Sequence, residues 1–189
     1  MFAAGLVTVV IGFCAPRLPD PATADRNGLL RWVVTQDLSQ EPYERRLVLA
    51  RRLEHEFGER VDWPTVGNGL NEPQKQRLWD NVQVLLEPWF ADKVDGYFAV
   101  REAERRAFVD RTLELIENWK GAAALCADPP PGAGDGKRPG LLEVFAERVA
   151  RWTRSASPQR RDQVRQFLLA VQTRWLQRAL LGAGAAKAL

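Results

Sequence analysis

The chain is poor in histidine and cysteine, with one histidine and two cysteines in 189 residues. A zinc site needs several His or Cys ligands, and only Cys126 could join His55 outside the apolar N-terminal segment. His55 lies between Glu54 and Glu56, so we expect a surface histidine, and we expect Cys126 to be an inert thiol. A nucleophile paired with His55 stays open, because distance along the sequence does not exclude it. No catalytic, cofactor-binding or metal-binding residue is predicted, and we expect a protein that is not an enzyme.

The sparse cysteines also leave the compartment open. Cys14 lies in the apolar segment and Cys126 stands alone in the rest of the chain, so no disulfide within one domain marks an oxidising environment.

Two other patterns are missing. No run of alternating apolar and polar residues after residue 27 predicts a strand, so we expect an all-α fold. The glycine-rich stretch from Gly132 to Lys137 has Pro131 where a phosphate-binding loop needs glycine, and Arg138 where it needs Ser or Thr. This stretch is therefore interpreted as a linker.

The first residues, Met1 to Ala15, carry no charged side chain. As a helix they would span about 22 Å at 1.5 Å per residue, whereas the core of a bilayer is about 30 Å thick. We predict a membrane anchor over residues 1–16; a cleaved signal or a buried soluble element are the alternatives. Arg17, Arg26 and Arg31 follow it, which places the remainder in the cytoplasm under the positive-inside rule. Basic residues upstream of this start would reverse that orientation. We therefore expect a single-pass protein of a bacterial inner membrane, and the side of the membrane that holds the remaining residues stays undecided.

Charge divides the rest of the chain. Residues 27–128 hold 14 Lys/Arg and 18 Asp/Glu, a net charge of −4, whereas residues 137–189 hold 11 basic and 3 acidic residues, a net charge of +8. The Pro/Gly-rich stretch over residues 128–140 is typical of a linker. We predict an acidic helical module over residues 17–127 and a basic helical module over residues 141–189.

Helical spacing and caps place the elements of both modules. The pattern predicts a helix over residues 43–57, ended by Gly58 and a turn at residues 62–64, and a second turn at residues 67–69. Asn71 and Gln74 form a capping-box pattern before a helix that Pro88 should kink. Further helices are expected over residues 101–120, over residues 141–154, and after the Ser157-Pro158 start. Expected inward residues include Ala107, Phe108, Leu115, Ile116, Trp119, Val164, Phe167, Leu168, Val171, Trp175 and Leu176.

Two helix starts carry a resemblance. The stretches Gly69-Leu-Asn-Glu-Pro-Gln-Lys-Gln-Arg77 and Ser155-Ala-Ser-Pro-Gln-Arg-Arg161 resemble the Pro-Glu-Gln-Arg helix starts of Arg-rich bacterial helical proteins, many of them membrane-anchored or exported. Residues 70–74 are also similar to the Leu-Thr-x-x-Gln motif of periplasmic helical-hairpin chaperones and metal-stress proteins, with Asn71 in place of Thr. The resemblance implies a helical envelope protein and transfers no functional residue. The two starts match either as an internal repeat or through shared capping chemistry.

Arginines dominate the basic module as candidate contact residues: Arg148, Arg151, Arg154, Arg160, Arg161 and Arg165. They could dock on the acidic module of the same or another copy, lie on anionic lipid, contact phosphates of nucleic acid, or form a solvated face. No recognised nucleic-acid motif supports the third possibility. The acidic groups Asp92 with Asp95, and Asp110 with Glu114 and Glu117, are interpreted as ion-pairing surfaces.

These observations predict a membrane-anchored helical protein that mediates protein contacts, as a scaffold, adaptor or chaperone-like protein. Its mechanism would be helix-in-groove packing through apolar and Trp-bearing faces, with an unknown protein or a second copy as partner. The alternative is a basic module that binds a membrane surface or nucleic acid, and binding that collapses at high salt would favour it.

Overall fold

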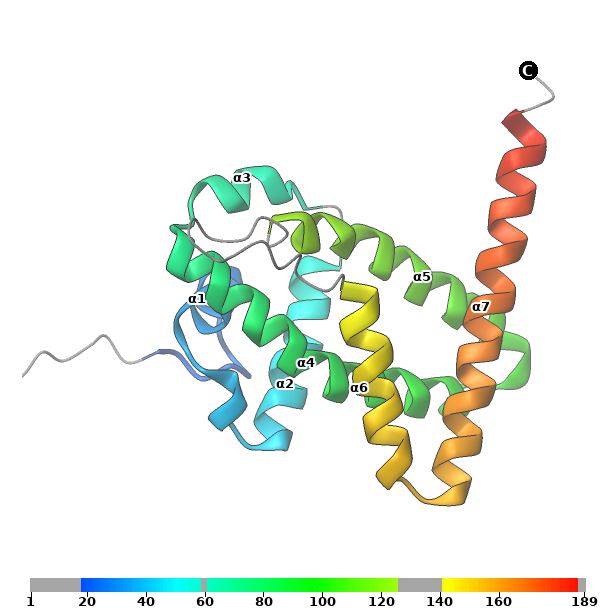
Figure 1. Ribbon diagram of the computed structural model, residues 1–189. Helices are drawn as coiled ribbons and strands as arrows, with labels where there is room; N and C mark the ends of the chain where they lie inside the picture. The colour runs from blue at the N-terminus through cyan, green and yellow to red at the C-terminus, as the bar shows by residue number, and fades with distance from the viewer. Residues whose placement is uncertain (1–17, 59–60, 126–140, 187–189) are drawn as a thin grey trace, which may run out of the picture.

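The computed structural model describes residues 18–58, 61–125 and 141–186 (Figure 1). This part of the chain forms seven α-helices and one 3-10 helix and contains no strand, which confirms the prediction of an all-α fold. The elements are α1 Arg26–Thr35, η1 Leu38–Gln40, α2 Tyr43–Phe57, α3 Trp63–Asn68, α4 Glu72–Ala99, α5 Glu102–Leu125, α6 Leu141–Ser155 and α7 Pro158–Ala186. The expected anchor over residues 1–16 and the linker over residues 128–140 lie outside the described residues. None of the described helices is both long and apolar enough to span a membrane.

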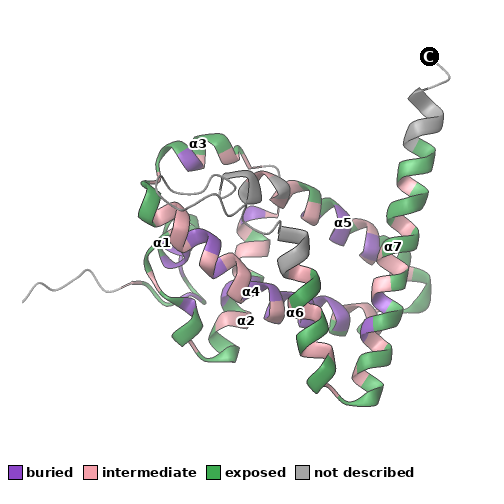
Figure 2. Cartoon of the chain, viewed as in Figure 1, coloured by how far each residue is buried: buried purple, intermediate pink, exposed green. Residues whose placement is uncertain are grey.

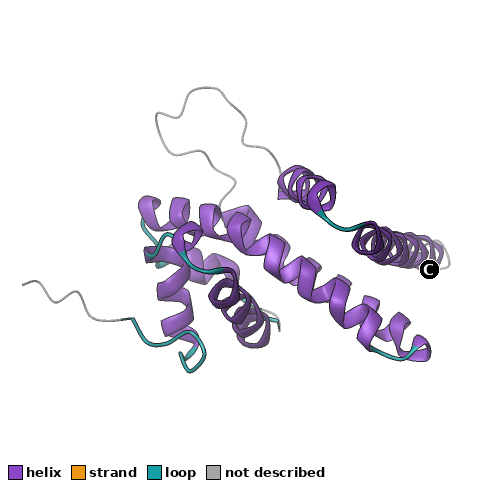
Figure 3. Cartoon of the chain, turned by 90° about the horizontal axis from the view of Figure 1, so that it is seen from below, coloured by secondary structure: helices purple, strands orange, loops and turns teal. Residues whose placement is uncertain are grey.

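Helix α4 is the centre of the fold. It packs against α1, α2, α5, α6, α7 and η1, and Figure 3 shows α6 and α7 as a pair lying on one side of the other helices. One continuous cluster of buried apolar side chains runs from Ala24 before α1 to Phe167 in α7. The acidic and basic regions therefore share a hydrophobic core.

The caps predicted at the starts of α4 and α7 are present. The Asn71 side chain accepts a hydrogen bond from the Gln74 backbone N–H, and the Gln74 side chain accepts one from the Asn71 N–H, both at 3.0 Å, which confirms the capping box. The Ser157 hydroxyl accepts a bond from the Arg160 N–H at 3.2 Å at the start of α7. Helix α4 continues through the buried Pro88 to Ala99 as one helix.

The buried amide of Asn81 ties α4 to the segment between α1 and η1. Its side chain donates to the carbonyl oxygens of Val33 and Gln36 at 2.8 and 2.6 Å, and accepts from the Leu38 N–H at 3.0 Å. Asn81 is only 1% exposed, so these bonds satisfy backbone groups that water cannot reach.

The local structure differs from the sequence-based expectations in three ways. Residues 62–64 are not only a turn but begin α3, because the Asp62 side chain caps the Thr65 N–H and Pro64 suits the first turn. Helix α1, which the sequence pattern did not predict, begins where the Asp25 side chain accepts from the Gly28 N–H at 2.7 Å. Three residues expected to point inward are exposed: Ala107, Trp175 and Leu176.

Candidate functional site

Among the six arginines predicted as contacts, Arg160 reaches the acidic region. Its guanidinium pairs with Asp95, donates to the Ala91 carbonyl oxygen at 3.2 Å and lies 5.2 Å from the Trp152 ring centroid. Arg151 and Arg165 instead pair within their own helices, with Glu147 and Asp162. Arg148, Arg154 and Arg161 form no ion pair with any other side chain that the structure describes.

Two arginines that the sequence analysis did not select make the main ionic contact between α7 and α5. Arg174 binds Asp110 through two hydrogen bonds of 2.7 and 3.0 Å. Arg178 lies 2.8 Å from Asp110 and 3.0 Å from Glu114. The hydrogen bond from Arg174 holds the pKa of Asp110 below its ordinary value, although burial opposes this shift. Both charge pairs have i, i+4 spacing, so the matching intervals on two helices were a usable sequence signal.

The remaining candidates for chemistry are surface groups. The His55 side chain is 77% exposed and lies 3.2 Å from Glu56, which confirms the expected surface histidine. Asp92 binds Arg51 at 2.6 Å, as expected of an ion-pairing surface. No cluster of three or more potential metal ligands occurs within residues 18–58, 61–125 and 141–186. Cys126 and the glycine-rich stretch lie outside the described residues.

Helix α7 carries five of the seven exposed large apolar side chains among the described residues, and we define its outer face as Leu169, Thr173, Leu176 and Leu180. The three leucines are 62%, 48% and 74% exposed. At about 100° per residue they lie roughly 180° to 220° around the helix from the buried Phe167. In Figure 2, exposed residues continue along α7 where it extends beyond the other helices. Helix α7 therefore carries apolar side chains on two opposite sides.

This outer face carries no charge. From Gln166 to Leu181 the only charged residues are Arg174 and Arg178, and both bind carboxylates of α5. The polar positions that flank the leucines, such as Gln172 and Gln177, are neutral amides. Because Arg174 and Arg178 bind α5, the positive charges of this half of α7 lie on the side that faces α5.

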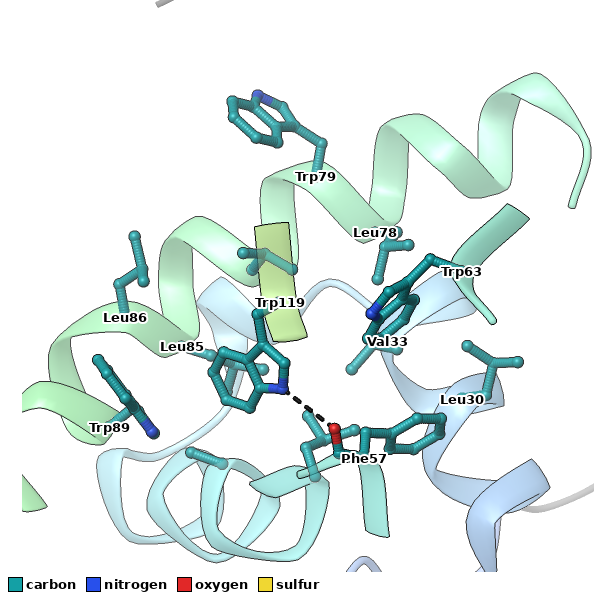
Figure 4. A pocket seen from close by; sticks show the side chains of 13 residues that line it. Leu30, Val33, Phe57, Trp63, Leu78, Trp79, Leu85, Leu86, Trp89 and Trp119 are labelled. Carbon is teal, nitrogen blue, oxygen red and sulfur yellow. Dashed lines mark hydrogen bonds between the residues drawn. The ribbon is translucent and has the colours of Figure 1, made fainter. Parts of the chain in front are cut away.

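A second candidate is an apolar cavity of about 100 Å³ bounded by five helices (Figure 4). The residues that line it all have apolar or indole side chains: Leu30, Val33, Ala50, Leu53, Phe57, Trp63, Leu78, Trp79, Val82, Leu85, Leu86, Trp89 and Trp119. They come from α1, α2, α3, α4 and α5. We call this space the tryptophan cavity.

Three of its indole rings are fixed by hydrogen bonds that their N–H groups make to the protein. Trp63 donates to the Asn118 carbonyl oxygen at 2.8 Å, and Trp119 donates to the Phe57 carbonyl oxygen at 3.3 Å. Trp89 donates to the Glu54 carboxylate at 2.9 Å. Figure 4 shows these three rings, from α3, α5 and α4, around the same space. The indole N–H groups are thereby satisfied, and the rings offer the cavity mainly carbon.

Comparisons with known proteins identify no relative of this chain. No protein-family model matches the sequence, and neither the curated proteins nor the solved structures give a match.

Proposed function

We propose that this protein is a non-enzymatic helical scaffold, and that two copies assemble through the outer face of α7. The observation that carries the proposal is that α7 is apolar on two opposite sides while the described helices cover one side. A helix buries its apolar faces against other elements, so an apolar face left uncovered on the second side of α7 is a candidate contact surface. The N-terminal anchor remains an expectation, and the proposed assembly does not depend on it.

A second copy suits this face because of its charge. The chain has a net charge of +3, and its basic region alone carries +8, so contacts between basic surfaces of two copies would be repulsive. The outer face between Leu169 and Leu180 is uncharged, since Arg174 and Arg178 are bound to α5. Two such faces can therefore meet without like-charge repulsion.

Leucine spacing and the remaining charges favour an antiparallel pair. With the twofold axis between residues 174 and 175, Leu169 of one copy faces Leu180 of the other, and Thr173 faces Leu176. The alternating spacing of four and three residues is that of a coiled-coil seam. In this register the exposed Arg165 lies opposite Gly184, whereas a parallel pair would place the two copies of Arg165 side by side.

The mass of the full chain in solution tests the assembly. Sedimentation equilibrium should give a mass that rises from 21.3 kDa toward twice that value with concentration, and the rise should persist at high salt because the seam is apolar. The double variant Leu176→Glu/Leu180→Glu should stay monomeric with unchanged helical content. Leu181→Glu is the matched control: Leu181 is 70% exposed but lies on the inner side of α7, so this variant should still dimerise.

These variants share residues 1–17, so association through that segment would survive in all of them. A double variant that dimerises like the wild type would refute the proposal. Self-association that high salt abolishes would also contradict the apolar seam, because it would indicate ionic contacts between the basic and acidic regions of two copies.

The orientation of the pair has its own measurement. A spin label on Gln159→Cys, with Cys14 and Cys126 replaced by alanine, should report a separation of about 45 Å between two antiparallel copies, at 1.5 Å of rise per residue. A parallel pair would place the two labelled positions about 10 Å apart. A short distance would therefore reject the antiparallel register while leaving dimerisation itself intact.

A further inference from the structure

We propose that the tryptophan cavity is a binding site for a small, uncharged apolar molecule, with a planar aromatic ring or short alkyl group as the part that enters. The cavity lies among α1 to α5, whereas the proposed assembly uses α7. This inference is therefore independent of the proposed function.

The chemistry of the walls selects the ligand class. The indole N–H groups of Trp63, Trp89 and Trp119 already bond to the protein, and the other lining side chains, apart from Trp79, have no polar atom. A charged or strongly polar ligand would lose its hydration without gaining hydrogen bonds, which is costly. An apolar ligand has no hydrogen bonds to water to lose, and it gains contacts with the carbon atoms of the walls.

The same walls disfavour water as the occupant. A buried water needs two to four polar partners, and apolar cavities stay dry and accept benzene or xenon when they are of the order of 150 Å³. The tryptophan cavity, at about 100 Å³, is of the same order but partly open to solvent, and a water molecule inside it finds few polar partners among the lining side chains.

The walls are also held in place before any ligand arrives. Phe57 and Trp63 are stacked, with ring centroids 6.0 Å apart and planes 21° apart, and the Trp89 and Trp119 centroids are 5.6 Å apart. Glu54, which holds the Trp89 indole, is itself bound by Lys93 at 2.6 Å. Rings fixed in this way need little ordering when a ligand binds, which favours affinity.

Benzene is the probe for the test, titrated into the full chain by calorimetry. Saturable binding at one site per chain is expected. Ala50→Leu places a larger side chain in the cavity, since Ala50 lines it and is only 3% exposed, and it should weaken benzene binding by about tenfold or more while the chain stays folded. Leu176→Glu/Leu180→Glu should bind benzene like the wild type, because it alters only the outer face of α7.

Three results would overturn the site: no saturable binding by the wild type, equal affinity in Ala50→Leu, or loss of binding in the α7 variant. If Ala50→Leu does not fold, Val33→Ile takes its place, because it adds one methyl group at another wall of the cavity. Weaker binding by folded Val33→Ile supports the site, and unchanged affinity contradicts it.

Discussion

Helices α4 and α7 are nearly equal in length, 28 and 29 residues, but they are covered very differently. Helix α4 has five other α-helices packed around it and eleven buried residues. Among the described side chains of α7, only Val164 and Phe167 are fully buried. Both helices distribute apolar residues widely around their circumference, but the described helices cover only one side of α7, and under the proposed assembly a second copy covers the other.

The two helices also differ in where their paired basic side chains lie. Lys93 of α4 is only 9% exposed, and its ammonium lies 2.6 Å from Glu54 and 3.6 Å from Asp92. A buried cation persists only when it is paired in this way. In α7, Arg174 and Arg178 bind α5 at the edge of the structure, which leaves the outer face neutral.

The largest effect should come from the inner side of α7. Phe167 is 2% exposed and its ring lies near those of Phe90, Tyr97 and Phe108. We expect Phe167→Ala to lower the free energy of unfolding by about 3 to 5 kcal/mol, because it removes a buried aromatic side chain and leaves a cavity. Urea denaturation at low protein concentration measures this loss.

Leu169→Ala, two residues away on the outer face, is the matched control. It should change the stability of the monomer by less than about 0.5 kcal/mol. Equal losses in the two variants would mean that the outer face is covered within the same chain.

A polar group on α4 gives the next largest effect. Asn81→Ala removes three hydrogen bonds and leaves the backbone groups of Val33, Gln36 and Leu38 without that partner. We expect a loss of about 2 to 3 kcal/mol, measured by thermal and urea unfolding. The exposed Asn27 offers the control, since Asn27→Ala should stay within about 0.5 kcal/mol of the wild type.

The elements that sequence could predict are those with local signals. The bounds of α2, the capping box at Asn71 and the start of α7 at Ser157 all depend on residues within a few positions of each other. Helix α1 has no such clear pattern: it contains Gly28 and a β-branched run from Val33 to Thr35, which are weak helix formers. Packing against α4 compensates for this weak propensity, and a local pattern does not reveal such packing.

The candidate sites show the same division. Asp110 and Glu114 were placed on one helix face correctly, but their partners Arg174 and Arg178 lie more than sixty residues away. Leu176 was assigned to the core because its spacing fits an apolar stripe equally well on either side of α7. The tryptophan cavity depends on how side chains from five helices fit together, so no spacing along one helix could predict it.

Replacing two buried alanines by leucine, Ala50 of α2 and Ala91 of α4, compares the space in the tryptophan cavity with the packed core. Ala50 borders the tryptophan cavity, whereas Ala91 is buried, 4% exposed, and does not border it. Ala91→Leu should destabilise the chain by about 1 to 3 kcal/mol, because a well-packed region has no space for the larger side chain. Ala50→Leu should leave the melting temperature unchanged or raise it, because free space exists there. Equal destabilisation would mean that both sites are fully packed.

The smallest expected loss of stability comes from the ionic contact of Arg174 and Arg178 with Asp110. At pH 7, Asp110→Asn should lower the stability by about 1 kcal/mol, because it weakens the ionic hydrogen bonds of a partly exposed carboxylate. Glu147→Gln, which removes an exposed ion pair with Arg151, should change it by less than about 0.5 kcal/mol.

The pH dependence identifies the cause of that loss. Because the Arg174 hydrogen bond lowers the pKa of Asp110 in the folded chain, its contribution is fully present above the unfolded value of about 3.9. It is lost as the pH falls through the lower folded value. The stability difference between the wild type and Asp110→Asn, measured by urea unfolding at successive pH values, should therefore decrease below about pH 4. A difference that stayed constant into strong acid would mean that Asp110 acts through packing and not through its charge, and the neutral outer face of α7 would then need another explanation.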